Sequence, residues 1–258
     1  MNDFYKFTVD LTKKAGEFLK ELYHLDFVVS HKGDDIRDVV TDADIKISHF
    51  ISSAIKKQFP DHAIYSEEGT DIFVKKTKYV WSIDPIDGTS NFSRHIPHFA
   101  ICVGLMENGV PVIGAVYNPI TDELFSFQKG GGAFLNGQKI RISLETDLKK
   151  SFVLLHVGRD PKIRDWGIGL YKKLLGEVKK INNFASSSLD ICFVAAGRAE
   201  LAVYGTLTTM DISSAIGILE EAGGQIMVSD LSEKFSKKPQ KVFAVCNNAI
   251  KERVAKYF

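Results

Sequence analysis

The order of hydrophobic patterns along the chain limits its possible folds more than any other feature. Apolar residues recur at helical spacing over residues 4–22 and again over residues 47–59. Short apolar runs bounded by turn residues follow between residues 63 and 128, and Asn108-Gly109 between two of them is a strong hairpin signal. Strand and helix patterns then alternate from residue 152 onward. This order predicts an α+β or α/β fold built as a layered sandwich.

The individual elements follow from the same patterns. We expect strands at residues 63–66, 79–83, 99–107, 110–117, 123–128, 152–157, 180–184, 201–204 and 243–246. Besides the two early helices, we expect helices at residues 165–176, around 189–196 and 212–219, and at 247–257. The second early helix should begin near Thr41–Asp42 and end before Pro60. Two lobes, residues 1–145 and 146–258, would meet at a cleft and form one folded unit.

The near-neutral charge of the chain argues against functions that depend on bulk electrostatic attraction. Its 258 residues include 33 Lys+Arg and 32 Asp+Glu, a formal net charge of +1. This balance gives no general attraction to nucleic acid or to an anionic membrane. Three widely spaced cysteines, Cys102, Cys192 and Cys246, argue against a disulfide framework. Because no stretch has the pattern of a signal peptide or a membrane span, we expect a cytoplasmic protein.

The most informative segment follows the expected strand at 79–83 and reads Asp84-Pro85-Ile86-Asp87-Gly88-Thr89. Pro85 restricts the backbone, so the two aspartates are held at a fixed spacing. Two carboxylates this close repel each other unless a cation lies between them. Oxygen ligands suit Mg²⁺ or Mn²⁺ better than Zn²⁺. Gly88 allows the backbone to approach a ligand closely. A polar turn with no ligand is the alternative interpretation.

Three more acidic segments are candidates for the same site. Glu67-Glu68 follows the expected strand at 63–66, where acidic side chains could complete a metal site. Asp42 and Asp44 open the second helix, and Asp42 is a credible N-cap. Asp211 opens a late helix, where a capping role is the simpler interpretation.

Taken together, these segments resemble the inositol monophosphatase family of magnesium-dependent, lithium-sensitive phosphatases. The family's first signature, D-P-[IL]-D-G-T-x-N-F, matches Asp84–Phe92. Its glutamate pair matches Glu67-Glu68, and its second signature matches Met210–Ala215 together with Glu221–Gly224. The ending Ala244–Asn248 is also similar. The resemblance covers nearly the whole chain in order, and it implies a layered αβαβα sandwich of the sugar-phosphatase type that forms a homodimer.

The resemblance also implies roles for individual residues. Glu67, Asp84 and the Ile86 carbonyl would hold a first Mg²⁺. Asp84, Asp87 and Asp211 would hold a second, Glu67 would reach a third, and Glu68 would support the cluster. Asp44 and Thr89 would hold and activate the attacking water. The implied substrate contacts are Gly88, Thr89, Ser90, Ser186 and Tyr204.

The substrate end of the expected cleft departs from the family pattern. Family members that act on inositol phosphates often carry Trp and Glu where this chain has Met210 and Tyr204. A tyrosine offers one hydroxyl and a ring in place of a carboxylate, or it is simply a core residue. Ser186-Ser187-Ser188 is also unusual, with helix capping or substrate contact as its two interpretations. The polar loop 32–38 has the composition of a mobile lid or of a plain solvated loop.

These features leave several functions open. The leading expectation is a Mg²⁺-dependent phosphomonoesterase that hydrolyses a small sugar or polyol phosphate, with inositol monophosphate first. The alternatives are fructose-1,6-bisphosphatase, 3′(2′),5′-bisphosphate nucleotidase and histidinol-phosphate phosphatase. A non-catalytic phosphate-binding relative is a more remote alternative, because every expected carboxylate is present.

Overall fold

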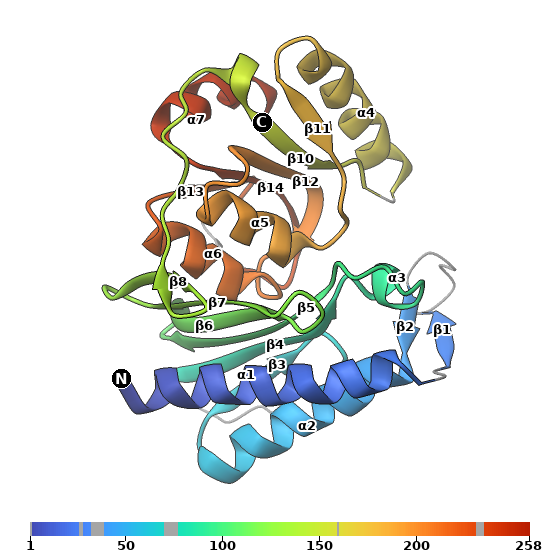
Figure 1. Cartoon of the computed structure of the whole chain (residues 1–258), viewed down its shortest axis with the longest axis vertical. Helices are drawn as coiled ribbons and strands as arrows, with labels where there is room; N and C mark the ends of the chain where they lie inside the picture. Colours follow the sequence, from blue (N-terminus) through green and yellow to red (C-terminus); the bar gives the residue numbers. More distant parts are fainter. Residues whose placement is uncertain (1, 26–27, 32–38, 70–76, 159, 231–234) are drawn as a thin grey trace.

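The computed structural model describes residues 2–25, 28–31, 39–69, 77–158, 160–230 and 235–258. The predicted lid, residues 32–38, lies outside this part of the chain. Helices and sheets alternate in five layers along the long axis of the molecule (Figure 1). This arrangement confirms the expected αβαβα sandwich. Within the described residues, no helix is long and apolar enough to cross a membrane.

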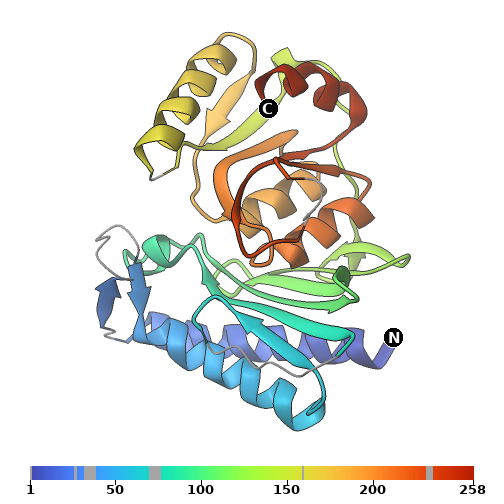
Figure 2. The same cartoon turned by 180° about the vertical axis from the view of Figure 1, so that it is seen from behind.

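The first layer consists of two long helices, α1 (Asn2–Tyr23) and α2 (Asp42–Gln58). The amphipathic pattern of α1 buries Leu11, Ala15 and Leu19, and the helix lies close against strand β6 of the first sheet. A Cβ on Gly16 would lie 2.3 Å from the Tyr117 ring, so this contact requires glycine. Both helices run along the same face of that sheet (Figures 1 and 2). Beside them lies a two-stranded sheet of β1 (Val29–His31) and β2 (Val39–Thr41).

Seven strands in sequential order form the first sheet. Only the β3–β4 pair is parallel, and the other neighbouring pairs are antiparallel. The strands are β3 (Ala63–Ser66), β4 (Tyr79–Asp87), β5 (Ala100–Glu107), β6 (Val110–Asn118), β7 (Glu123–Gln128), β8 (Gly132–Leu135) and β9 (Gln138–Lys139). The short helix α3 (Thr89–Phe92) follows β4 directly.

The second half contributes the remaining three layers. Helices α5 (Ser187–Ala195) and α6 (Ser213–Glu221) lie between the two sheets (Figure 1). The five-stranded sheet has the order β11-β10-β12-β14-β13. Its strands are β10 (Phe152–His156), β11 (Lys180–Asn182), β12 (Leu201–Thr208), β13 (Gln225–Val228) and β14 (Pro239–Val245). The outer layer contains α4 (Pro161–Leu175) and α7 (Asn248–Val254). Single-turn 3₁₀ helices span Leu148–Lys150 and Ala255–Tyr257.

Most predicted elements are confirmed, with shifted ends. Strand β4 continues to Asp87, four residues past its predicted end, and strands β1, β2, β8, β9 and β13 and the short helix α3 were not predicted. The predicted N-cap Asp42 is wrong, because Thr41 caps α2 and Asp42 is the first helical residue. The chain passes from one sheet to the other between Lys139 and Phe152, a connection that contains the predicted boundary at residue 145.

Glu221, at the end of α6, ties this middle layer to the first sheet. Its two carboxylate oxygens accept hydrogen bonds from the backbone N–H groups of Gly130 (2.8 Å) and Gly132 (2.9 Å). These residues form the turn between β7 and β8. The glutamate of the second signature therefore has a structural role, because it satisfies backbone donors that the turn leaves unpaired.

Candidate active site

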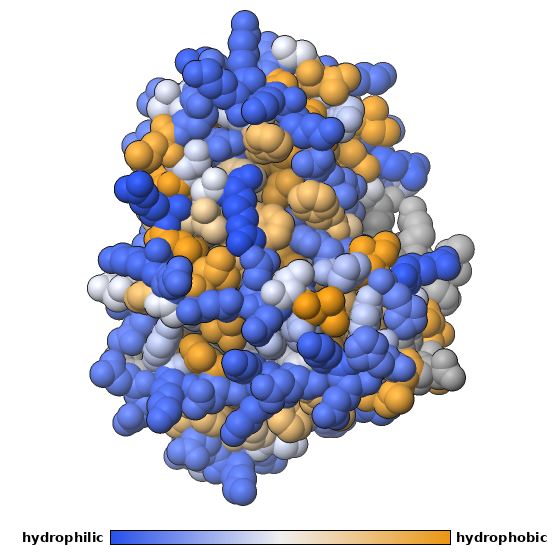
Figure 3. Space-filling model, in the orientation of Figure 1, coloured by the Kyte–Doolittle hydropathy of each residue, from blue (hydrophilic) through white to orange (hydrophobic). Residues whose placement is uncertain are grey.

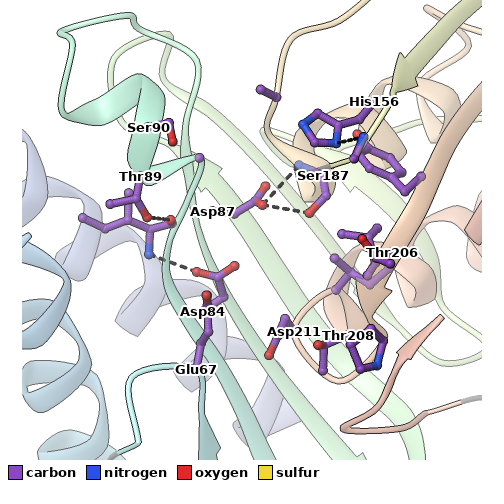
Figure 4. Close-up of a pocket in the computed structure, with 18 residues that line it drawn as sticks. Glu67, Asp84, Asp87, Thr89, Ser90, His156, Ser187, Thr206, Thr208 and Asp211 are labelled. Carbon is purple, nitrogen blue, oxygen red and sulfur yellow. Dashed lines mark hydrogen bonds between the residues drawn. The ribbon is translucent and has the colours of Figure 1, made fainter. Parts of the chain in front are cut away.

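A cleft of about 570 Å³ receives side chains from both halves of the chain. The residues predicted for the site from sequence that line this cleft are Glu67, Asp84, Ile86, Asp87, Gly88, Thr89, Ser90, Tyr204 and Asp211. Three other predicted site residues, Asp44, Glu68 and Ser186, lie outside this lining. The lining residues come from the ends of β3 and β4, from α3, and from the far end of β12 (Figure 4). Residues more than a hundred positions apart thus meet at one site.

A bulge in β4 places the two motif aspartates. Asp84 pairs with Cys102 and Asp87 pairs with Ala100, so β4 has one more residue than β5 between these pairs. Pro85 lies within the bulge, where its missing N–H costs no ladder hydrogen bond. Bulges redirect side chains and are common beside active sites. Here the bulge allows two aspartates three residues apart to reach the same cleft.

Asp84 lies at the centre of the acidic residues. It is 4% exposed, and its Oδ1 accepts a hydrogen bond from the Ile86 N–H (3.1 Å). Burial raises the pKa of Asp84 well above its ordinary value, and the nearby carboxyl groups of Glu67, Asp87 and Asp211 raise it further. Figure 4 shows Glu67 and Asp211 beside it in the cleft. This concentration of carboxyl groups around a buried aspartate favours binding of a cation.

Asp87 points across the cleft to the N-terminus of α5 (Figure 4). Its Oδ2 accepts hydrogen bonds from the Ser186 hydroxyl (2.6 Å) and the Ser188 N–H (2.7 Å). Its Oδ1 accepts from the Ser187 hydroxyl (2.8 Å) and the Ser187 N–H (3.1 Å). Burial nevertheless raises the pKa of Asp87, which these hydrogen bonds only partly oppose. The unusual serine run thus holds an aspartate of the first signature.

Asp44 lies beside Thr89, which lines the edge of the cleft. The Thr89 hydroxyl lies 3.2 Å from Asp44 Oδ1 and 2.9 Å from the Ile86 carbonyl oxygen. Asp44 Oδ2 accepts from the Thr41 N–H (2.7 Å) and hydroxyl (2.6 Å), forming a capping box at the start of α2. Burial is the main reason that the pKa of Asp44 rises to about 7. A carboxyl group with such a pKa is suited to accept a proton near neutral pH.

The oxygen donors of these side chains suit Mg²⁺, but the described side chains are spread apart in this structure. The carboxylates offer only oxygen, which Mg²⁺ prefers; Asp84 and Asp87 are buried, Asp211 is half-buried and Glu67 is exposed, and no lysine or arginine of the described residues lines the cleft. Among the described residues, no three acidic, histidine or cysteine side chains lie close enough to hold an ion as they stand.

Backbone geometry at Gly88 and Ala185 closes one wall of the cleft. Gly88 has φ = 100°, and a Cβ there would lie 3.2 Å from the His98 carbonyl oxygen and 3.4 Å from that of Ala185. Ala185 itself has φ = 60°, a left-handed conformation that costs a non-glycine residue about 1 kcal/mol. This strained residue immediately precedes the serines that bind Asp87. The turn at Gly88 therefore packs closely against the segment that contains Ala185.

Tyr204 lines the far end of the cleft but keeps its hydroxyl inside the protein. It is 3% exposed, and the hydroxyl donates a hydrogen bond to Oδ2 of Asp190, which is 2% exposed. The other Asp190 oxygen lies 3.5 Å from His98 Nε2. The His156 ring stacks on Tyr204 with centroids 6.1 Å apart and planes 24° from parallel. Tyr204 is therefore a buried residue that also lines the cleft, and its contact with a substrate stays a prediction.

Comparison with known proteins agrees with this geometry. Residues 1–258 match the profile of the Inositol monophosphatase family. The chain belongs to the inositol monophosphatase family. It is 36% identical over 234 residues to an inositol monophosphatase of Mesembryanthemum crystallinum, covering 88% of this chain and 85% of that protein. Members of the family are phosphoric monoester hydrolases, and this chain is one of them.

Two further relatives extend the comparison. The chain is 34% identical to the fructose-1,6-bisphosphatase/inositol-1-monophosphatase of Thermotoga maritima, covering 97% of this chain and 93% of that protein. The crystal structure of the extragenic suppressor protein suhB from Bartonella henselae has a TM-score of 0.90 at 29% identity, covering 98% of this chain and 96% of that chain. The family membership and the αβαβα fold expected from the motifs are confirmed.

Sequence reasoning missed four residues that shape the site. Thr41 holds Asp44, Ser187 lines the cleft and binds Asp87, and Asp190 and His156 surround Tyr204. A threonine just before a helix and a serine run just before another were readable signals for the first two. His156 ends a strand, and Asp190 lies within an otherwise apolar helix, where no local pattern distinguishes a site residue from a core residue.

Proposed function

We propose that the chain is a Mg²⁺-dependent phosphomonoesterase that hydrolyses a small sugar or polyol phosphate, with inositol monophosphate as the first candidate. The observation that carries this proposal is the meeting of Asp84, Glu67 and Asp211 with the Asp44–Thr89 pair at one cleft. Two or three Mg²⁺ ions would be held by Glu67, Asp84, the Ile86 carbonyl, Asp87 and Asp211, and Mn²⁺ has the same ligand preferences.

The residues of the chain divide the work of hydrolysis. The ions, when bound, supply positive charge that offsets the phosphate and lowers the pKa of water. Asp44 accepts a proton from the attacking water, and Thr89 orients that water through its hydroxyl. The N–H groups of Gly88 and Thr89 lie at the start of α3, where helical partners are absent, and they bind phosphate oxygens. The left-handed backbone of Gly88, which a glycine adopts without strain, brings these groups close to the substrate.

Fructose 1,6-bisphosphate is the second candidate substrate, because the Thermotoga maritima relative is named for both activities. Nucleotidase and histidinol-phosphatase activities stay as further alternatives at the same carboxylates. A non-catalytic phosphate-binding protein is disfavoured by the complete set of acidic residues.

A phosphate-release screen tests the proposal. The purified protein is assayed with inositol 1-phosphate, fructose 1,6-bisphosphate, adenosine 3′,5′-bisphosphate and histidinol phosphate, each with Mg²⁺, with EDTA, and with Mg²⁺ plus Li⁺. We expect Mg²⁺-dependent, Li⁺-inhibited release from at least one substrate. Release from none, by protein that is folded by circular dichroism, contradicts the proposal.

We also propose a cytoplasmic homodimer. The location is supported by the three cysteines, which are all buried and free. Dimerisation is supported by three exposed apolar side chains on one face of α4, Ile168, Tyr171 and Leu175. Figure 3 shows apolar surface in the region that α4 occupies in Figure 1. Light scattering on wild type and on Leu175→Glu tests this, and we expect the variant to have half the mass of the wild type.

A further inference from the structure

A hydrogen bond between two buried serines joins the two halves of the chain beside the carboxylates. The hydroxyl oxygens of Ser82 and Ser213 lie 2.5 Å apart, and the two residues are 2% and 0% exposed. Ser82 lies in β4, two residues before Asp84, and side chains two residues apart on a strand share a face. Ser213 begins α6, two residues after Asp211. The bond therefore connects the segments that carry two of the proposed metal ligands.

Two glycines let the first turn of α6 lie directly on the first sheet. Gly104 of β5 pairs with Ser82. A Cβ on Gly104 would lie 2.8 Å from the Ser82 hydroxyl oxygen and 3.2 Å from that of Ser213. A Cβ on Gly114, in β6, would lie 2.9 Å from the Cα of Ser214. Each buried hydroxyl of the Ser82–Ser213 pair therefore satisfies the other in a close contact that excludes water.

Repulsion between Asp84 and Asp211 opposes the closeness that a shared ion requires of them. Asp211 is near enough to raise the pKa of the Asp84 carboxyl group, and like charges near a buried group repel. Mg²⁺ demands near-ideal geometry of its ligands, so an aspartate held in the wrong place weakens binding. A contact that keeps α6 against β4 before the ion arrives reduces the free-energy cost of bringing the ligands together.

We propose that the Ser82–Ser213 hydrogen bond is a positioning contact for the proposed metal site. The bond holds the first turn of α6 against β4, and in this way it sets the separation between Asp211 and Asp84. The described lining of the cleft includes neither serine, so both act through the aspartates and not on the substrate. The inference rests on the proposed Mg²⁺-dependent function.

Binding of Mg²⁺ alone, measured by calorimetry without substrate, tests the contact directly. Ser82→Ala and Ser213→Ala each remove one oxygen atom, so we expect both variants to fold. The dissociation constant of Mg²⁺ should rise by roughly three- to tenfold in each, the range expected for one buried hydrogen bond. The double variant should show no larger rise than either single variant, because both substitutions break the same bond. The kcat at saturating Mg²⁺ should stay within about twofold of the wild-type value.

Two further variants separate positioning from a general loss of stability. Ser214→Ala removes a neighbouring buried hydroxyl that has no hydrogen-bond partner among the described residues, so Mg²⁺ affinity should not change. Ser126→Ala breaks the hydrogen bond of another buried serine, to Tyr5 (3.0 Å) of α1, on the opposite face of the first sheet. It should lower the free energy of unfolding in EDTA, as Ser82→Ala does, but leave the Mg²⁺ dissociation constant unchanged.

The possible outcomes distinguish this inference from the proposed function. If Ser82→Ala and Ser213→Ala bind Mg²⁺ as tightly as the wild type, the positioning contact is overturned and the proposed function stays in place. An equal rise of the dissociation constant in Ser126→Ala, or a double variant whose rise is the product of the two single ones, has the same consequence. Wild-type protein that binds no Mg²⁺ and releases no phosphate in the substrate screen overturns the proposed function, and the positioning contact with it.

Discussion

Metal binding, which is proposed, and hydrogen bonding to the start of α5, which is observed, use the same two oxygens of Asp87. Asp87 is a proposed Mg²⁺ ligand, and it also accepts four hydrogen bonds from the first residues of α5. The four hydrogen bonds occupy the roughly four lone-pair sites of the carboxylate, so an ion bound here would displace at least one of these donors. The aspartate therefore links the proposed metal site in one half of the chain to a helix in the other half. Its replacement should affect both activity and stability.

We expect Asp87→Asn to reduce kcat by roughly a hundredfold or more, because the variant lacks one carboxylate of the metal site. The asparagine amide also turns a donor toward the Ser187 or Ser188 N–H. This mismatch should lower the free energy of unfolding by about 1–3 kcal/mol. Steady-state assays and urea denaturation measure the two effects, with exposed Asp165→Asn as the control. Full activity in the folded variant contradicts the assignment.

At the scale of elements, the turn from β4 into α3 depends on a glycine. Gly88 and Gly109 both have positive φ, 100° and 77° respectively, but only Gly88 has neighbours within 4 Å of a built Cβ. An alanine at either position costs about 1 kcal/mol for the left-handed backbone. At Gly88 the added methyl group also presses on the carbonyl oxygens of His98 and Ala185.

Gly88→Ala should therefore lose most phosphatase activity and more stability than Gly109→Ala, which should lose stability alone. Thermal unfolding and phosphate release, measured on both variants, give the comparison. Equal activities in the two variants would show that the close approach at Gly88 does not position the site.

The contact between α6 and the β7–β8 turn gives a second prediction at this scale. Glu221→Gln keeps one acceptor oxygen, but its NH₂ group then faces the Gly130 or Gly132 N–H, so that two donors lie against each other. We expect a loss of about 1–3 kcal/mol in the free energy of unfolding with kcat retained, since the contact lies outside the cleft lining. Chemical denaturation measures it, and Glu252→Gln on exposed α7 surface is the control. No loss of stability would contradict the structural role of Glu221.

The sequence predicts an element well when neighbouring residues determine it, and poorly when contacts with distant residues determine it. Helices α1 and α2 follow from apolar spacing, and Asp84 and Asp87 follow from a local motif, so both were predictable. Within the described part of the chain, strand β13 pairs only with β14, so its presence depends on a contact with a distant segment. The same holds for Asp190, whose significance comes from a hydrogen bond to a residue on another element. Local sequence patterns determine where helices and strands form, whereas tertiary packing determines which elements and residues contact one another.

For the whole molecule, the net charge of +1 conceals a concentrated acidic site. Burial raises the pKa values of Asp44, Asp84 and Asp87. Ionisation of these groups therefore destabilises the folded, metal-free protein. The rise of the Asp44 pKa from 3.8 to about 7 corresponds to on the order of 4 kcal/mol. A bound cation removes this penalty by favouring the ionised forms.

The sign of the resulting pH dependence is definite. A carboxyl group whose pKa is raised on folding stabilises the folded state below its unfolded pKa, and this stabilisation is lost as pH rises toward the folded pKa. Protein in EDTA should therefore lose stability between about pH 4 and pH 7 through Asp44. Asp44→Asn should raise the melting temperature at pH 8 relative to wild type and have little effect at pH 4. A variant less stable than wild type at pH 8 would contradict this.

The dependence of turnover on free Mg²⁺ tests the central claim most directly. Phosphate release from inositol 1-phosphate, or from the best substrate of the screen, is measured as Mg²⁺ is raised from zero in EDTA to millimolar levels. Asp84→Asn, folded by circular dichroism, is measured beside the wild type. We predict that wild-type turnover rises from background to a plateau, returns to background on chelation, and is absent in the variant. Equal turnover in EDTA and in Mg²⁺, or full activity of Asp84→Asn, would contradict the claim that these carboxylates form a magnesium-dependent phosphatase site.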